Sequence, residues 1–388
     1  MAINDHITAS QAEIAAWRRH LHTHPELLYD VPETAAFVAD KLASFGCDTV
    51  ATGIGGTGVV GLIHGREGGE GRTVGLRADM DALPIEEETG LSYASTQAGK
   101  MHACGHDGHM AMLLGAARVL AETRRFAGTV AVVFQPAEEG GAGAKAMIDD
   151  GLLDRFPMTE LYGMHNLPGL AVGRFAIRPG PIMASTDEFS ITIEGRGGHA
   201  AMPHTTMDPI AIGAAMVQSL QMIVSRSANP LDSLVVSVTQ FHAGFVHNVI
   251  PEKAVLSGTV RALTEPMREL AEARIRQIAE STAAAHGARA LVDYDRNYPV
   301  TRNEPQATSF CTEVAAAVAG ADNVDVDAPP LMGGEDFAYM LEERPGAFIF
   351  VGNGDSAGLH HPRYDFNDEA IAFGASYWIA LAEGALGR

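Results

Sequence analysis

Residues 108–141 read GHMAMLLGAARVLAETRRFAGTVAVVFQPAEEGG, and they are the best guide to the fold class of this chain. Residues 108–123 place apolar side chains such as Met110 and Leu113 at helical spacing, which predicts a helix. Residues 129–135 form a largely apolar, β-branched run, which is typical of a strand buried on both faces of a sheet. A helix followed by such a strand indicates an α/β protein.

The same alternation of helices and strands continues on both sides of this stretch. Helices are predicted at 10–22 and 33–45, and strands at 58–64, 73–78, 160–164 and 347–351, with a glycine-rich turn at 66–72. Because strands alternate with helices, we expect a larger domain with a mainly parallel sheet flanked by helices.

The middle of the chain has a different pattern. Strands are predicted at 188–194, 233–241, 253–263 and 289–294, and helices at 208–226 and 266–286. The order β-α-β-β-α-β is that of a ferredoxin-like α+β domain. We therefore expect an inserted domain at 187–297, and we expect segments 1–186 and 298–388 to build the larger domain together.

The composition excludes several classes of protein. The 388 residues include 27 Lys and Arg against 48 Asp and Glu, which gives a formal net charge of −21. Such a charge repels nucleic acids and anionic membranes, so neither is an expected partner. Only 3 Cys are present, no run of about 18 apolar residues occurs, and the N-terminus lacks the layout of a signal peptide. These features predict a soluble, cytoplasmic protein.

Acidic or imidazole side chains follow four of the predicted strands. They are Asp79 and Asp81 after 73–78, Glu138 and Glu139 after 129–135, His165 after 160–164, and His360 and His361 after 347–351. Ligands of open α/β sheets bind at the carboxyl ends of the strands. Carboxylates gathered there without balancing lysines are costly unless a cation binds. The alternative is four unrelated polar loops, which this fourfold recurrence disfavours.

Residues 100–112, KMHACGHDGHMAM, hold the densest group of metal-binding side chains. Cys104 and His106 are two positions apart, so an extended backbone would point both at one ion. Gly105 lets the backbone approach closely, and the N-terminus of the following helix is expected to lower the thiol pKa. Cys104 could instead be a small buried hydrophobic residue, but beside His106 we favour a ligand.

Other candidates are weaker. His20, His22 and His24 are spaced by two beside Pro25, so they do not share a helix face, and Cys47 and Cys311 are expected in the core. The sequence leaves open whether His199, in GRGGHAAMPH, reaches a site or is simply exposed to solvent. Arg261 lies in an otherwise apolar strand, so it is either paired or held for an anionic ligand.

Seven motifs occur in a fixed order: HACGHDGH, FQPAEEGGAGA, MHNLPG, GRGGHAAMPH, NVIP, MGGEDF and LHHPRYDFND. As an ordered set they closely resemble the hippurate hydrolase and N-acyl-amino-acid amidohydrolase branch of the dinuclear metallopeptidases, to which plant auxin-conjugate hydrolases are also similar. The resemblance covers nearly the whole chain. It implies a catalytic domain with two metal ions and an inserted lid that also mediates dimerisation.

The resemblance also assigns residues. It implies the metal ligands Cys104, His106, Glu139, His165 and His360. Glu138 matches the general base, and His199 matches a histidine that polarises the scissile carbonyl, in many relatives from the partner subunit. Asn248 and Arg261 fall where more distant relatives hold the free carboxylate of the substrate. Asp79 and Asp81 stand where many relatives carry a His ligand and its Asp partner, and Asp81 is expected to support the ligands without binding metal.

The activity implied by the resemblance is metal-dependent hydrolysis of an N-acyl amino acid to a carboxylate and a free amino acid. Hippurate, N-acetyl amino acids and N-acetyl-diaminopimelate are candidate substrates, and a dipeptidase of the same family is an alternative. Mixed sulfur, nitrogen and oxygen ligands suit Mn, Zn, Co or Ni. A homodimer or a dimer of dimers is expected.

Three other hypotheses compete with metal-dependent amide hydrolysis. A thiol hydrolase would use Cys104 as nucleophile with His106 or His109 as base. A serine hydrolase would use Ser356 in GDSAG, but that motif runs into a proline-containing loop where the nucleophile elbow needs a helix. A metal-storing or regulatory relative without activity is the third, and the presence of Glu138 beside the complete ligand set argues against it.

Overall fold

The computed structural model describes residues 3–66 and 72–387. Contacts between residues divide the chain into two compact units. The first unit comprises residues 1–182, 302–329 and 336–388, and the second comprises 183–301 and 330–335. The insert predicted at 187–297 falls inside the second unit, whereas residues 67–71 of the predicted glycine-rich turn lie outside the described residues.

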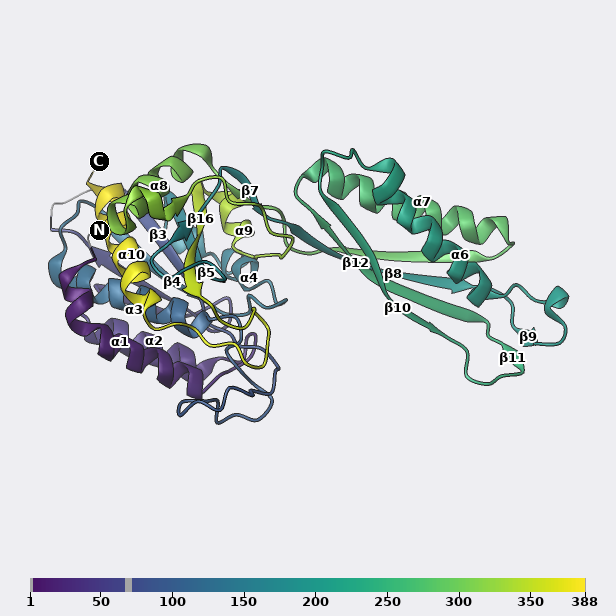
Figure 1. The fold of residues 1–388 in the computed structure, drawn as a ribbon, viewed down its shortest axis with the longest axis horizontal. Helices are drawn as coiled ribbons and strands as arrows, with labels where there is room; N and C mark the ends of the chain where they lie inside the picture. The colour runs from purple at the N-terminus through teal and green to yellow at the C-terminus, as the bar shows by residue number, and fades with distance from the viewer. Residues whose placement is uncertain (1–2, 67–71, 388) are drawn as a thin grey trace. The chain divides into compact units, whose positions relative to one another are not determined.

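The first unit is built on a sheet of the order β1-β2-β4-β3-β5-β16-β6-β15 (Figure 1). Its neighbouring strands β4, β3, β5 and β16 pair in parallel, whereas β1, β2 and β6 join it by antiparallel pairing. The mainly parallel α/β architecture is therefore confirmed. The strands are β1 Thr49–Ile54, β2 Gly58–His64, β3 Thr73–Asp79, β4 Thr129–Gln135, β5 Glu160–Pro168, β6 Phe175–Ala176, β15 Val324–Asp325 and β16 Gly346–Gly354.

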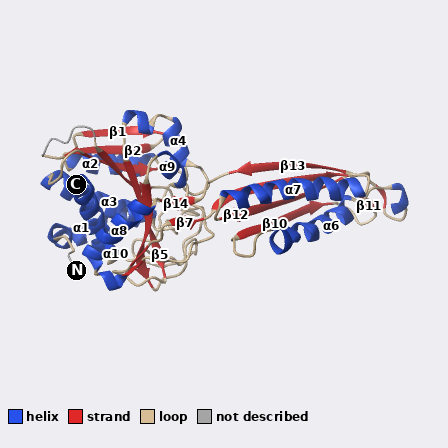
Figure 2. Ribbon diagram, turned by 90° about the horizontal axis from the view of Figure 1, so that it is seen from above, coloured by secondary structure: helices blue, strands red, loops and turns tan. Residues whose placement is uncertain are grey.

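Helices cover both faces of this sheet (Figure 2). One layer contains α1 Asp5–Thr23, α2 Pro32–Ser44, α3 His106–Thr123, α8 Pro305–Ala319 and α10 Ala370–Leu386. The other face carries the short helices α4 Gly143–Asp149 and α9 Ala338–Glu343, and α5 Leu152–Arg155 follows α4. Nearly every residue of α3 is buried, because α3 packs against α1, α10 and the sheet.

Two elements differ from their predicted bounds, and both differences matter for the site. Strand β5 continues past residue 164 to Pro168, because β16 pairs with it along its whole length, so His165 lies within the strand. Helix α3 begins at His106 and not at 108. Cys104 and His106 therefore do not share an extended segment; Gly105 separates them with a left-handed φ of 91°.

The second unit has the strand order β10-β12-β8-β13, with all neighbours antiparallel. This is the ferredoxin-like order expected from the β-α-β-β-α-β pattern. Its elements are β8 Ser185–Glu194, α6 Pro209–Met222, β10 Leu234–Ala243, β12 Lys253–Ala262, α7 Glu265–Ala285 and β13 Arg289–Arg296. A separate small ladder is formed by β9 Gly198–His199 and β11 Val249–Ile250. Strand β14 Thr301–Asn303 pairs with β7 Gly180–Met183, and most residues of this ladder belong to the first unit.

Candidate metal centre

The five ligands implied by the resemblance converge around the sulfur of Cys104. Cys104, His106 and His165 offer one ligand atom each within 4.8 Å of one another. Cys104, Glu139 and His360 form a second group by the same measure. Cys104 belongs to both groups, so its sulfur lies at the centre of the candidate ligand set.

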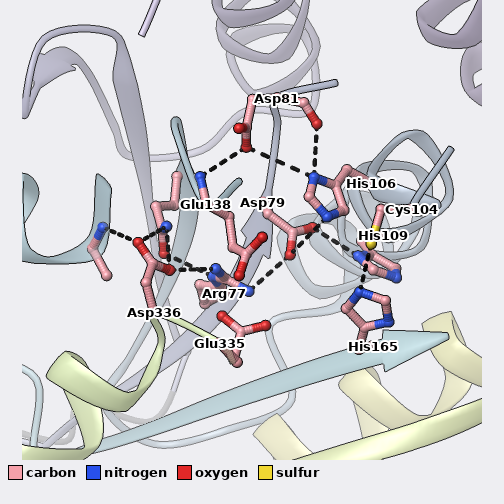
Figure 3. Close-up of polar contacts among 12 residues, drawn as sticks. Arg77, Asp79, Asp81, Cys104, His106, His109, Glu138, His165, Glu335 and Asp336 are labelled. Carbon is pink, nitrogen blue, oxygen red and sulfur yellow. Dashed lines mark hydrogen bonds and ion pairs between the residues drawn. The ribbon is translucent and has the colours of Figure 1, made fainter. Parts of the chain in front are cut away.

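His106 is oriented for coordination through Nε2. Its Nδ1 lies 2.7 Å from the backbone carbonyl of Asp81, which can only accept, so Nδ1 carries the proton (Figure 3). Its Nε2 is buried, has no hydrogen-bond partner among the described residues, and lies 3.7 Å from Asp79 and 3.9 Å from Glu139. Although burial lowers the pKa of His106, the carboxylates of Asp79, Asp81 and Glu139 raise it to about 10, and a cation bound at Nε2 would take the place of that proton.

His165 has the same arrangement. Its Nδ1 donates to the carbonyl of Asn166 at 2.7 Å, and its Nε2 faces Cys104 Sγ at 3.3 Å. Figure 3 shows the ring of His165 directed at the sulfur from strand β5. Both histidines thus direct Nε2 to the same region, and the neutral imidazole is the form that binds metals.

Glu139 and His360 complete the second group. Oε1 of Glu139 is buried and forms an ion pair with Nε2 of His360 at 3.2 Å, with no hydrogen bond of regular geometry within the part of the chain that the structure describes. His360 adopts a left-handed φ of 62°, and its backbone N–H donates to Ala103 at 2.8 Å, which places its loop beside the Cys104 segment. These unsatisfied buried atoms, together with a thiol, fit a pair of divalent ions.

The thiol of Cys104 is not activated as a free nucleophile. Burial, together with the charges of Glu139 and Glu138, raises its pKa well above the ordinary value of a thiol. The expected lowering by the helix N-terminus is therefore wrong, because burial and nearby carboxylates outweigh it. A cysteine hydrolase needs a lowered thiol pKa, whereas a coordinated thiolate does not depend on one.

A buried ion network lies beneath the ligands. Arg77 on β3 donates to Gln135 at 2.8 Å, to Asp79 at 2.9 Å and to Asp336 at 3.0 Å. Asp79 also lies 2.7 Å from Nδ1 of His109. Although burial alone would raise the pKa of Asp79, His106, His109 and Arg77 hold it well below its ordinary value, so the carboxylate stays ionised.

Asp81 supports the turn that carries the two glutamates. Its Oδ1 accepts from the backbone N–H of Glu138 at 2.9 Å, and its Oδ2 accepts from that of Glu139 at 3.1 Å. Glu138 is 7% exposed and groups with His106 and Glu139 within 4.8 Å. The carboxylate expected to act as base therefore lies directly beside the candidate ligands.

Three predicted residues lie in the second unit. His199 and Asn248 are exposed neighbours, because β9 pairs with β11 and the N–H of Ala200 donates to Asn248 at 3.0 Å. Arg261 lies near the opposite end of β12, where its guanidinium contacts Thr259 and donates to Val260 at 2.9 Å. At ~3.3 Å per residue, the eight residue-to-residue steps from Lys253 to Arg261 span roughly 26 Å. One copy of this unit cannot place Arg261 and Asn248 on the same carboxylate.

Sequence reasoning missed Arg77, Asp336 and Asn166, which hold the ligand segments. An arginine inside the apolar run TVGLRA and the acid in MGGEDF were available signals for the first two.

The weaker candidates have structural roles: His22 is buried against Asp107 at 2.9 Å, and Cys311 is buried. The hydroxyl of Ser356 donates to a backbone carbonyl in a loop, not at the start of a helix.

Comparisons with known proteins place the chain in a family. The model of peptidase family M20/M25/M40 matches residues 75–384. The chain belongs to this family. It is 42% identical over 372 residues to hippurate hydrolase of Campylobacter jejuni, covering 96% of each protein. It is 39% identical over 375 residues to the IAA-amino acid hydrolase ILR1-like 4 of Arabidopsis thaliana, covering 94% of this chain and 84% of that protein.

A solved structure of the family agrees with the fold. The YXEP protein of Bacillus subtilis, a dinuclear metal-binding M20 peptidase, matches with a TM-score of 0.86 and 36% identity, covering 98% of this chain and 99% of that one. The resemblance drawn from the ordered motifs is confirmed, and the protein is a hydrolase of this family. None of the helices in residues 3–66 and 72–387 has the length and apolarity needed to span a bilayer.

Proposed function

We propose that this protein hydrolyses the amide bond of N-acyl amino acids with two divalent ions. The proposed ligands are Cys104, His106, Glu139, His165 and His360. The observation that carries the proposal is the convergence of thiol, imidazole and carboxylate ligand atoms in groups within 4.8 Å, beside the carboxylate of Glu138. Bound ions would polarise the acyl carbonyl and lower the pKa of a water to near neutrality.

Glu138 is the proposed general base. Its backbone is fixed by Asp81, and its side chain is almost fully buried beside the ligands. From there the carboxylate can accept a proton from the attacking water and deliver it to the nitrogen of the leaving amine. The pKa of an amine makes it a poor leaving group without that proton, so both transfers are needed.

The two ends of the second unit are proposed to serve different active sites. Arg261 would bind the substrate carboxylate for one site, while His199 and Asn248 would reach the site of a second copy, with His199 polarising the scissile carbonyl. The roughly 26 Å along β12 supports this division. Exposed apolar residues near Asn248, among them Phe245 at 80% exposure, support burial of this end in a homodimer or a dimer of dimers.

Substrate and metal follow from the relatives and the ligand chemistry. Hippurate and N-acetyl amino acids are the first candidate substrates, followed by N-acetyl-diaminopimelate and dipeptides. The expected location of the protein is the cytoplasm. Manganese, zinc, cobalt and nickel all accept mixed thiolate, imidazole and carboxylate ligands. The test strips the protein with a chelator, restores each ion separately and measures hydrolysis across this panel together with the ions bound per chain.

The variant Glu138→Gln tests the base. It should bind both ions yet lose at least about 100-fold in kcat, because the amide cannot take the proton. Near wild-type turnover in that variant contradicts the assignment.

A mixture of two inactive variants tests the shared site. Glu138→Gln and His199→Ala chains, refolded together, should recover about a quarter of wild-type activity, because random pairing gives heterodimers with one intact site. No recovery in verified heterodimers means that His199 acts within its own chain or not at all.

A further inference from the structure

Asn166 is a polar residue beside the candidate ligands whose side chain and backbone both make hydrogen bonds to their surroundings. It follows His165 on β5 and is fully buried. Its side chain and backbone together contact three separate segments of the first unit that carry candidate ligands.

The side-chain amide joins two of these segments. Its Nδ2 donates to the backbone carbonyl of Cys104 at 2.6 Å. Its Oδ1 accepts from the hydroxyl of Tyr364 at 2.8 Å, and Tyr364 is itself fully buried, four residues after His360. One amide therefore connects the Cys104 turn with the His360 loop, and its donor and acceptor roles are fixed because a carbonyl can only accept.

The backbone of Asn166 determines which ring nitrogen carries the proton in two histidines. Its carbonyl accepts from Nδ1 of His165, which leaves Nε2 free to face Cys104. Its N–H donates to Nε2 of His109 at 3.0 Å, so the proton of that ring resides on Nδ1 and points at Asp79. The same residue thus orients one candidate ligand and the acid network beneath it.

The backbone between the first two ligands is shaped to accept these side chains. A Cβ at Gly105 would collide with Nδ2 of Asn166 and with the hydroxyl of Tyr364. Gly105 also has a φ of 91°, which side-chain-bearing residues rarely adopt. The turn that carries Cys104 and His106 is therefore packed directly on the Asn166–Tyr364 pair.

We propose that Asn166, with Tyr364, is a positioning residue that sets the spacing of Cys104, His165 and the His360 loop for metal binding. The proposal rests on the metal-dependent function above. Because thiolate, imidazole and carboxylate must lie within a narrow range of distances from an ion, losing the hydrogen bonds that orient them typically costs 10–100-fold in metal affinity.

The opposing view is that Asn166 is an ordinary buried asparagine that only stabilises the fold. Asn303 provides a matched control in the same unit. It is 1% exposed, its Nδ2 donates to Arg178 and Phe348 at 2.9 Å each, and its Oδ1 accepts from the N–H of Phe348 at 2.6 Å. Its side chain bonds three backbone groups, against one for that of Asn166, and its printed partners do not include a candidate ligand.

The experiment compares Asn166→Ala with Asn303→Ala, and Tyr364→Phe with Tyr162→Phe. Tyr162 is a buried tyrosine on β5 whose hydroxyl donates to Glu160 at 2.8 Å. Each variant is stripped of metal, and its melting temperature is measured. Metal affinity is then measured by competition with a chelating indicator, and the thiolate-to-metal charge-transfer band is recorded after loading with cobalt.

Asn166→Ala and Tyr364→Phe should each lose about 10–100-fold in metal affinity and shift or weaken the cobalt band. The two control variants should lose a comparable amount of melting temperature but keep the wild-type metal affinity and the wild-type cobalt band. Wild-type affinity and band in Tyr364→Phe overturn the proposal, even if Asn166→Ala does not fold. Wild-type metal binding without amide hydrolysis rejects the proposed reaction but not this inference, whereas no binding by the wild type overturns both.

Discussion

The substitution Arg77→Met tests the ion network that lies beneath the candidate ligands. Arg77 is 1% exposed and bonds Gln135, Asp79 and Asp336 at 2.8–3.0 Å. Methionine keeps most of the side-chain volume but removes the charge and these donors. The change should therefore leave buried carboxylates without their cation while leaving packing largely intact.

The expected loss of unfolding free energy depends on the hydrogen bonds that each carboxylate keeps after the substitution. Breaking a buried ion pair by removing one partner costs about 3–5 kcal/mol. Asp336 keeps Gln135 Nε2 at 2.7 Å and the N–H of Ala144 at 2.9 Å, and Asp79 keeps His109. Because each acid retains hydrogen-bond donors, we expect the low end, about 3 kcal/mol of unfolding free energy.

Urea unfolding of the metal-stripped protein, followed by tryptophan fluorescence, measures this loss. The only two tryptophans of the chain, Trp17 and Trp378, are buried in α1 and α10 of the first unit, so the signal reports that unit. Arg72→Met is the matched control, because Arg72 pairs with Glu160 at 2.7 Å but is 38% exposed. It should cost at most about 1 kcal/mol. Equal losses in the two variants would refute the reasoning.

Three further predictions concern the ligands and their surroundings. Gly105→Ala should abolish binding of both ions in elemental analysis. The control Gly46→Ala, where φ is 79° but no atom lies close to the added Cβ, should bind both ions normally. Normal binding in both variants contradicts the packing argument. His360→Ala should retain one ion per chain, because Cys104, His106 and His165 remain, and loss of both ions would show that the two groups are not separable. Burial lowers the pKa of His22, but its bond to Asp107 raises it from 6.5 to about 9, so unfolding free energy should fall as pH rises from 6.5 to about 9. The slope should be shallower in His22→Gln, and an unchanged slope would reject this source.

Local patterns in the sequence were sufficient to predict the architecture of both units. The run at 129–135 forms β4 with the predicted bounds, because a strand buried on both faces must be apolar throughout. The start of α3 was placed two residues late, because the glycine at 105 has a φ that no spacing rule reveals. Residue 165 was placed after its strand, because the length of β5 depends on its pairing with β16, a partner far along the chain.

The sequence predicts those site residues that stand next to one another in the chain, but not those that only the fold brings together. Cys104 with His106, and Glu138 with Glu139, are recognisable from neighbouring letters alone. Arg77 and Asp336 are 259 positions apart in sequence, so only the fold shows that they form one network. Asn166 is a similar case, because an asparagine after a strand histidine looks like an ordinary polar loop residue until its partners are known.

Backbone strain is concentrated where the candidate ligands are held. Among the described residues, the non-glycine positions with positive φ are Leu28, Arg124, Ala137, Ala142 and His360. Ala137 and Ala142 flank the Glu138–Glu139 turn, His360 is itself a candidate ligand, and the carbonyl of Leu28 accepts from the N–H of Ala137 at 3.1 Å. Each such conformation costs on the order of 1–3 kcal/mol and persists only where surrounding structure enforces it. Asp81 binds the N–H groups of Glu138 and Glu139, and Asn166 binds Tyr364 four residues after His360, so both stabilise the segments that contain these conformations. The buried atoms left unsatisfied at this edge of the sheet are therefore held in place by the fold before any ion binds, which is the condition for tight and specific coordination.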